Sequence, residues 1–163
     1  MTTTPKETRI MAGKYLTFGL GNEEYGIDIL KVQEIIRMQN ITRVPRMPAY
    51  IRGVINLRGK IIPVIELRSR FGMDVVEDTK NTCIIVVKIQ GTTQSIIMGI
   101  IIDAVKEVVN IEEDHVEQNL DFGASVNPEF LLGMGKVREK VVIMLDIDKV
   151  ISEEEIKQAE EAI

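Results

Sequence analysis

The sequence predicts an all-β fold, mainly strands with short helices, arranged as two similar small β-barrels in tandem. Three observations lead to this prediction: the kind of apolar residue, the alternation of apolar and polar positions, and an internal repeat. Isoleucine occurs 25 times and valine 17 times in 163 residues, whereas tryptophan is absent. Because β-branched side chains are stiff at χ1 and pack well on a pleated surface, this composition favours strands.

Length and cysteine usage define the broad class of protein. A chain of 163 residues can bury a core that needs no disulfide or metal for stability. The single cysteine, Cys83, excludes an intramolecular disulfide, and its apolar flanks predict a small buried thiol. No apolar run approaches the roughly 18 residues of a spanning helix, so we expect a cytoplasmic protein without direct membrane insertion.

Alternating segments separated by turn residues account for most of the chain, and the two ends differ from it. Residues 1–13 are polar and aperiodic, which predicts a flexible N-terminal tail. Ser152 and Glu155 form a capping box, which predicts a C-terminal helix over residues 152–163. The segments predicted as strands are 14–20, 24–29, 54–57, 61–65, 83–89, 95–102 and 140–147.

The internal repeat gives the domain organisation. Gly26–Ile36 aligns with Gly99–Val109 at an offset of 73, and Pro48–Leu67 aligns with Pro128–Ile147 at an offset of 80. Chance can produce one such match in a β-branched chain, but two ordered matches with Gly, Pro and Arg in register indicate duplication. We therefore predict a single domain over 14–151, with subdomains at about 14–73 and 81–151. Each subdomain is too small to bury much alone, so the two should share an interface.

In this repeat, Arg58 aligns with Arg138 and Glu34 aligns with Glu107. Charge is also unevenly distributed: residues 37–70 carry +7 and the remainder −12, for a net charge of −5. A basic region of this kind suggests an acidic protein surface or nucleic acid as partner. Within it, Tyr50 is the only aromatic residue, and the total charge opposes phosphate binding, so we expect no nucleic acid partner.

A search for chemistry finds no catalytic arrangement. The single histidine, His115, lies in the acidic run that begins at Glu112, and no cysteine or second histidine lies near it to bind zinc. The sequence contains neither a nucleophile elbow nor a complete phosphate-binding glycine motif. We therefore expect no catalytic residue, no metal, no cofactor and no enzyme activity. An alternative is a small-molecule-binding or enzymatic β-barrel domain that uses the acidic clusters.

Two long motifs resemble the CheW family of chemotaxis coupling proteins. They are Glu24–Ile35 and Gly53–Leu67, and the second is centred on Asn56-Leu57-Arg58-Gly59. The resemblance extends from about Lys14 to Ile151. It implies two SH3-like five-stranded β-barrels that share a hydrophobic core. It also implies a non-catalytic scaffold that couples chemoreceptors (methyl-accepting chemotaxis proteins) to the histidine kinase CheA.

The resemblance also implies partners and site residues. The partners are the regulatory domain of CheA, which has the same fold, and the cytoplasmic tip of chemoreceptors, so the protein is expected in the cytoplasm, recruited to membrane-associated receptor arrays. The residues that match family positions linked to receptor or kinase coupling are Arg58, Glu34, Val32, Gly53, Gly59, Gly99 and Val108. Kinase-contact apolar residues fall at Ile61 and Cys83, and the cysteine departs from the usual aliphatic residue.

Each of these residues also has a purely structural interpretation. The glycines can serve backbone geometry, and Val32 and Val108 can belong to the core. Arg58 can hold the carbonyl groups of its own turn, although a turn arginine between apolar strands has little structural need. Glu34, as a charged residue in an apolar strand, should face outward.

Overall fold

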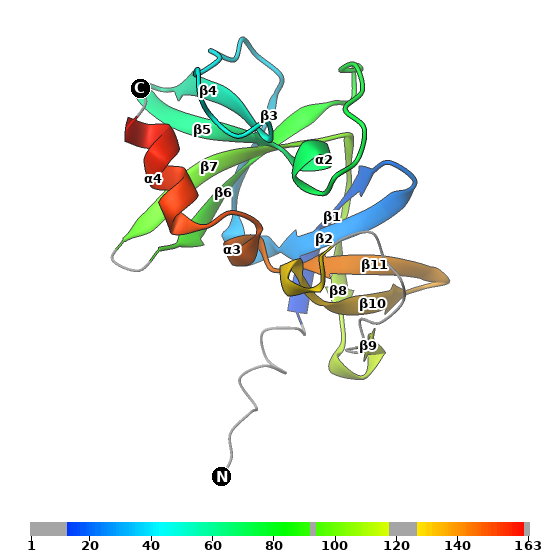
Figure 1. The fold of residues 1–163 in the computed structure, drawn as a ribbon. Coiled ribbons are helices and arrows are strands. Elements are labelled where there is room, and N and C mark those ends of the chain that lie inside the picture. Colours follow the sequence, from blue (N-terminus) through cyan, green and yellow to red (C-terminus); the bar gives the residue numbers. More distant parts are fainter. Residues whose placement is uncertain (1–12, 92–93, 118–126, 162–163) are drawn as a thin grey trace.

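The computed structural model describes residues 13–91, 94–117 and 127–161, in which eleven strands are the main elements (Figure 1). The predicted N-terminal tail lies outside this range except for Gly13, which opens the first strand. The strands are β1 (Gly13–Leu20), β2 (Glu23–Asp28), β3 (Val32–Arg37), β4 (Ile51–Leu57), β5 (Lys60–Glu66), β6 (Cys83–Gln90), β7 (Ser95–Ile102), β8 (Ala104–Ile111), β9 (Val116–Glu117), β10 (Leu131–Val137) and β11 (Lys140–Leu145).

Helices are short and connect or flank the strands. No helix of the described residues is long and apolar enough to cross a membrane. The α-helices are α2 (Leu67–Arg70), α3 (Ile147–Val150) and α4 (Glu153–Glu161), and the 3-10 turns are η1 (Ile29–Lys31), η2 (Glu113–His115) and η3 (Pro128–Phe130).

The strands form two sheets, which confirms the predicted mainly β fold. One sheet has the order β8-β1-β2-β11-β10-β9 and the other has the order β3-β6-β7-β5-β4. The sixth strand of the first sheet, β9, has two residues that pair with Met134 and Gly135 of β10. In the second sheet a single bridge between Thr42 and Val54 occupies the equivalent place. Each barrel is therefore five strands plus a short closing contact. We call the β3–β7 sheet the first barrel and the β1–β2 with β8–β11 sheet the second barrel.

The two halves of the sequence exchange strands. β5 pairs in parallel with β7, with Val64 opposite Gly99, and β11 pairs in parallel with β2, with Met144 opposite Gly26. These two registers are related by the same offsets, 80 and 73, that relate the halves of the sequence, so the fold repeats as the alignment predicts.

Both sheets draw strands from both halves of the chain. The second barrel takes β1 and β2 from the first half of the chain and β8–β11 from the second half. The first barrel likewise takes β6 and β7 from the second half. A division between residues 73 and 81 therefore does not separate the two sheets. Parallel neighbours need a long connection. The connection between β2 and β11 passes through the whole first barrel, whereas the one between β5 and β7 contains α2 and β6.

One core is shared by the two barrels, as expected. Its largest cluster of buried residues draws on both, and four aromatic rings cross it in a row: Phe18, Tyr25, Phe71 and Phe130, with centroids 5.7 to 6.0 Å apart. A smaller cluster fills the interior of each barrel. Full burial of each large apolar side chain contributes about 1.5–3 kcal/mol, so the shared cluster, which is the largest of the three, contributes most of the apolar stabilisation.

The C-terminal helix begins where the capping box predicts. The backbone N–H of Ser152 donates to Glu155 Oε1 at 2.9 Å, and the N–H of Glu155 donates to Ser152 Oγ at 3.1 Å. Arg70 at the end of α2 forms an ion pair with Glu155 at 3.7 Å. α4 consequently lies along the first barrel, beside β5 (Figure 1).

Gly53 in β4 is required by the backbone. Its φ of +151° is rarely adopted by other residues, and a Cβ placed there would lie 2.1 Å from the carbonyl oxygen of Thr42. The close approach exists because Thr42 and Val54 exchange two backbone hydrogen bonds of 2.8 Å each. Gly53 thus lets the β3–β4 connection close the first barrel.

We expect Gly53→Ala to lower the free energy of unfolding by about 2 kcal/mol or more, because it combines a strained φ with a backbone clash. Urea denaturation followed by circular dichroism measures this loss. Gly72→Ala is the matched control: Gly72 also has a positive φ, 76°, but open space around its Cβ position. A loss no larger for Gly53→Ala than for Gly72→Ala would contradict the clash.

A carboxylate, buried in the first barrel and half-buried in the second, lies at the end of one strand of each barrel. Glu66 ends β5 and Asp146 follows β11, and the two positions are equivalent in the repeat. Burial raises the pKa of Glu66 above its ordinary value of 4.5, although Arg52 opposes the shift. Burial likewise raises the pKa of Asp146 above 3.8.

The raised pKa of Glu66 predicts how stability depends on pH. The folded state holds this proton more tightly than the unfolded chain, so unfolding free energy falls as pH rises from about 4.5 through the folded-state pKa. The variant Glu66→Gln has no ionisable group at this position, so its unfolding free energy does not include this fall with pH. The difference in unfolding free energy, Glu66→Gln minus wild type, should therefore increase with pH over that window in urea titrations. A difference that decreases instead would mean that the attraction of Arg52 outweighs burial.

Candidate functional site

The best candidate for a functional site is the hairpin turn between β4 and β5. Leu57 pairs with Lys60, which leaves Arg58 and Gly59 as the two turn residues. Both have positive φ, 51° and 88°, as a type I′ turn requires. The N–H of Gly59 donates to Asn56 Oδ1 at 2.7 Å, which fixes the turn. The turn therefore presents the Arg58 side chain, which is 69% exposed, on a rigid support.

Arg58 forms an ion pair with Glu34 of β3. Arg58 Nη1 donates to Glu34 Oε1 at 3.2 Å, and Nη2 donates to Oε2. Both side-chain hydrogen bonds that Arg58 makes within the described residues go to Glu34. Arg58 therefore does not donate to the carbonyl groups of its own turn. The hydrogen bond between the two side chains lowers the pKa of Glu34 and raises the pKa of Arg58. The two-point contact holds both side chains in one orientation.

The second barrel carries an equivalent pair. Arg138, in the turn between β10 and β11, donates from Nη1 to Glu107 Oε2 at 2.9 Å and from Nη2 to Oε1 at 3.3 Å. Its φ of 58° matches that of Arg58. The hydrogen bond from Arg138 lowers the pKa of Glu107. Sequence reasoning aligned both residues with the first pair but did not name them as site residues, although that alignment contained the signal.

Exposed apolar side chains accompany each pair, also at equivalent positions. Ile35 follows Glu34 and corresponds to Val108, which follows Glu107; Ile61 of β5 corresponds to Val141 of β11. All four apolar side chains are 45–56% exposed. We call Glu34, Ile35, Arg58 and Ile61 the first-barrel set, and Glu107, Val108, Arg138 and Val141 the second-barrel set. Successive side chains of a strand point to opposite faces, so Ile35 and Val108 are exposed on the face opposite to Glu34 and Glu107. Exposed charge pairs and exposed apolar side chains on the same strands are typical of protein contact surfaces rather than of catalytic sites.

Of the other residues expected at the site, one is exposed on the surface and the rest shape or pack the strands. Val108 is exposed, whereas Val32 is half-buried and packs against the shared core. A Cβ on Gly99 would lie 2.7 Å from Ile84 Cγ2, so Gly99 allows β6 and β7 to pack closely. Gly53 shapes the barrel as described above. The structure thus brings Arg58, Glu34 and Gly59 together, whereas Val32, Gly53 and Gly99 belong to the framework of the strands.

Ile61 and Cys83 lie in different environments. Ile61 is about half exposed near the Arg58 turn. Cys83 begins β6, is a half-buried free thiol, and packs against the shared core. Burial raises the pKa of this thiol, which keeps it protonated.

The acidic groups of the alternative hypothesis have structural partners or lie in solvent. A recess of about 300 Å³ between the barrels is lined by Asp28, Asp146 and Asp148, among others. Asp28 caps η1, Asp146 caps α3, and Asp148 forms an ion pair with Lys31 at 2.8 Å. Glu112, Asp114 and His115 lie within 4.8 Å of one another but are exposed. These carboxylates therefore need no ligand to explain their positions.

Comparison with known proteins agrees with this arrangement. A family model described as the CheW-like domain matches residues 14–155. A chemotaxis protein CheW from Klebsiella aerogenes is 40% identical over 88% of this chain and 84% of its own length. A chemotaxis protein CheW from Thermotoga maritima is 31% identical over 88% and 90%, respectively.

A solved structure has the same architecture. The scaffolding protein TtCheW from Thermoanaerobacter tengcongensis superposes with a TM-score of 0.76 at 38% identity, over 86% of this chain and 92% of that one. Because the family model spans most of the chain, and relatives above 30% identity match nearly end to end, the chain belongs to the CheW-like family of chemotaxis scaffold proteins.

Proposed function

We propose that this chain is a non-catalytic adaptor that couples chemoreceptors to the histidine kinase CheA. The observation that supports this function best is the repetition of one docking chemistry on two barrels. The first-barrel set and the second-barrel set place an Arg–Glu pair and two exposed apolar side chains on each barrel. Because the barrels share one core, the two sets have a fixed spacing, which is what a scaffold with two partners needs.

Arg58 is the central contact residue of this proposal. A non-glycine residue in the left-handed region costs free energy, and such strain persists where function requires it. Glu34 holds the guanidinium in place, so little side-chain entropy is lost on binding. Arginine is also enriched among residues that dominate binding energy. Receptor coupling is therefore assigned to Arg58 and Glu34.

The remaining predicted residues support or extend this contact. Gly59 forms the turn that carries Arg58, and Gly53, Gly99 and Val32 maintain the strands around it. Val108 belongs to the second-barrel set. Ile61 offers exposed apolar area to the kinase, and Cys83 supports β6 from within the core.

The proposed setting follows from these partners. The adaptor works in the cytoplasm, recruited to membrane-associated receptor arrays, and binds the CheA regulatory domain and the receptor tip. A signal passes as a change in contact geometry, and no covalent bond is made or broken in this protein.

Calorimetric titration tests the proposal with two purified partners, the CheA regulatory domain and a cytoplasmic receptor fragment. We expect a saturable one-to-one complex with the kinase domain. Arg58→Ala should keep the wild-type melting temperature and weaken receptor binding about 30-fold, because it removes a central, preorganised arginine. Lys88→Ala, which removes an exposed positive charge from β6, is the matched control and should bind as wild type does.

Two results would count against the proposal. Absence of any complex with the kinase domain, with both proteins folded, would remove the kinase as partner. Wild-type receptor affinity in folded Arg58→Ala would show that Arg58 serves the turn alone.

A further inference from the structure

The arginines of the described residues differ in how they are paired. Every described arginine outside residues 37–46 forms an ion pair, namely Arg52, Arg58, Arg68, Arg70 and Arg138. Arg37, Arg43 and Arg46 are exposed and have no carboxylate partner among the described residues. Three free guanidinium groups therefore gather at the end of β3 and in the connection that follows it.

Arg43 lies at the junction of two recesses. Arg43 and Arg52 line both of them, and we call the two recesses together the Arg43 groove; their charged lining residues are these two arginines with Asp78 and Glu66. The first recess has a volume of about 440 Å³ and is lined by Met38, Gln39, Asn40, Ile41, Arg43, Arg52 and Asp78. The second has a volume of about 320 Å³ and is lined by Arg43, Ala49, Ile51, Arg52, Glu66 and Val75.

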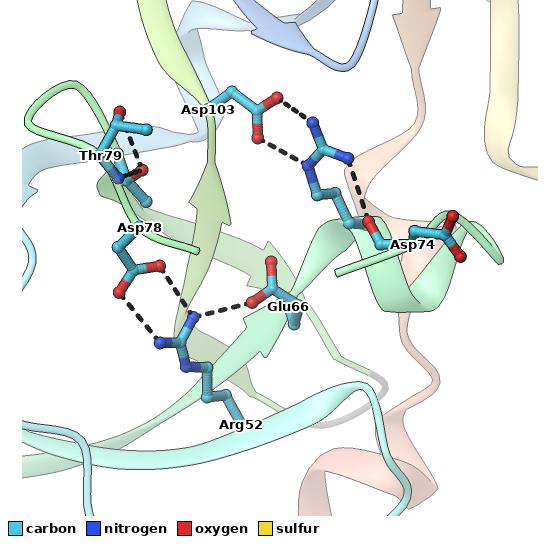
Figure 2. Close-up of polar contacts among 8 residues, drawn as sticks. Arg52, Glu66, Asp74, Asp78, Thr79 and Asp103 are labelled. Carbon is cyan, nitrogen blue, oxygen red and sulfur yellow. Dashed lines mark hydrogen bonds and ion pairs between the residues drawn. The ribbon is translucent and has the colours of Figure 1, made fainter. Parts of the chain in front are cut away.

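Arg52 already holds two carboxylates in this groove. Figure 2 shows Arg52 between Glu66 and Asp78. Arg52 Nη1 donates to Glu66 Oε1 at 2.8 Å, while Nη1 and Nη2 donate to the two oxygens of Asp78 at 3.3 and 3.0 Å. Glu66 is buried, but the Asp78 side chain is 36% exposed. The inner carboxylate is thus fixed, whereas the outer one is open to exchange, because solvent-exposed ion pairs are weak.

The segment that carries Asp78 shows which chemistry the groove accepts. It reads Asp74-Val75-Val76-Glu77-Asp78, an acidic stretch with two exposed valines, in the connection between α2 and β6. Asp78 reaches Arg52, and Val75 lines the second recess. One end of an acidic segment with apolar residues therefore occupies the groove from within the same chain, while Arg43 is left without a carboxylate.

We propose that the Arg43 groove binds an acidic segment of a partner protein, whose carboxylates pair with Arg43 and replace Asp78 on Arg52. Charge complementarity supports this occupant, since Arg43 lines both recesses without a carboxylate partner and Arg52 holds an exposed carboxylate. A nucleic acid fits less well, because no aromatic residue lines either recess, and the ring of Tyr50 in the same connection is covered by Arg70 at 4.5 Å. The net charge of −5 also opposes a polyphosphate.

The inference goes beyond the adaptor function and does not depend on it. The groove lies at the β3–β4 connection, and none of its lining residues belongs to the first-barrel or second-barrel set. Its test uses a synthetic peptide in place of the kinase or receptor, so failure of one proposal leaves the other standing.

Fluorescence anisotropy with the full chain tests the groove. The probe is a labelled peptide of two Asp-Val-Val-Glu-Asp repeats, and the reference probe replaces each acid with its amide. We expect binding of the acidic peptide alone, weakened by salt. Arg43→Gln should weaken it by about threefold or more, in the range of exposed ion pairs, and Lys88→Gln, with the same loss of charge elsewhere, should leave it unchanged.

Asp78→Asn gives a test with the opposite sign. It removes the intramolecular competitor and should tighten peptide binding about threefold. Glu77→Gln makes the same change of charge without freeing Arg52 and should give a smaller gain, and this difference distinguishes exchange at Arg52 from general attraction. Equal binding of the acidic and amide peptides, equal losses for Arg43→Gln and Lys88→Gln, or no gain for Asp78→Asn would each overturn the proposal. Inorganic phosphate or single-stranded RNA competing better than the acidic peptide would also overturn it, because the groove would then favour phosphates.

Discussion

The parallel pairing of β5 with β7 and of β11 with β2 is the constraint on which the rest of the structure depends. Each pair joins a strand from one half of the chain to a strand from the other half. Neither barrel can close without both halves, and the aromatic row from Phe18 to Phe130 is buried only when both barrels are present. Duplication with strand exchange therefore converts two units that are each too small to be stable into one rigid body.

Rigidity of this kind has a direct consequence for recognition. The two Arg–Glu pairs sit where the hairpin of each barrel reaches back to the strand that begins its sheet, so barrel closure positions them. Two further ion pairs tie the halves together at the junction: Arg68 with Asp103 at 2.6 Å, and Lys31 with Asp148 at 2.8 Å. Arg68 and Asp148 are equivalent in the repeat but opposite in charge. The ion pairs at the junction are thus not symmetric, whereas the first-barrel set and the second-barrel set share one chemistry.

Local sequence patterns predicted the strands and helices better than they predicted which strands pair with each other. The predictions that rest on local or repeated signals correspond to elements of the structure. The β-branched composition corresponds to the strands, and the Ser152–Glu155 capping box corresponds to the start of α4. The Gly26–Gly99 alignment corresponds to the two equivalent parallel registers. No local pattern shows that β1 pairs with β8 and β2 with β11, so the division of the strands between the two sheets follows only from the fold. Arg58 was recognised from its motif, but its pairing with Glu34 needs barrel closure. The Arg43 groove depends on residues up to 40 positions apart, so it emerged only from the fold.

Native-state hydrogen exchange tests the shared, strand-exchanged core most directly. The slowest amides of β1 in one barrel and of β6 in the other should report the same opening free energy, equal to that of global unfolding, because neither barrel can open alone. A denaturant series extends the comparison to both sheets at once. If the amides of one barrel exchanged through an opening several kcal/mol below the global value while the other barrel stayed protected, the barrels would be independent units and the single-scaffold account would be contradicted.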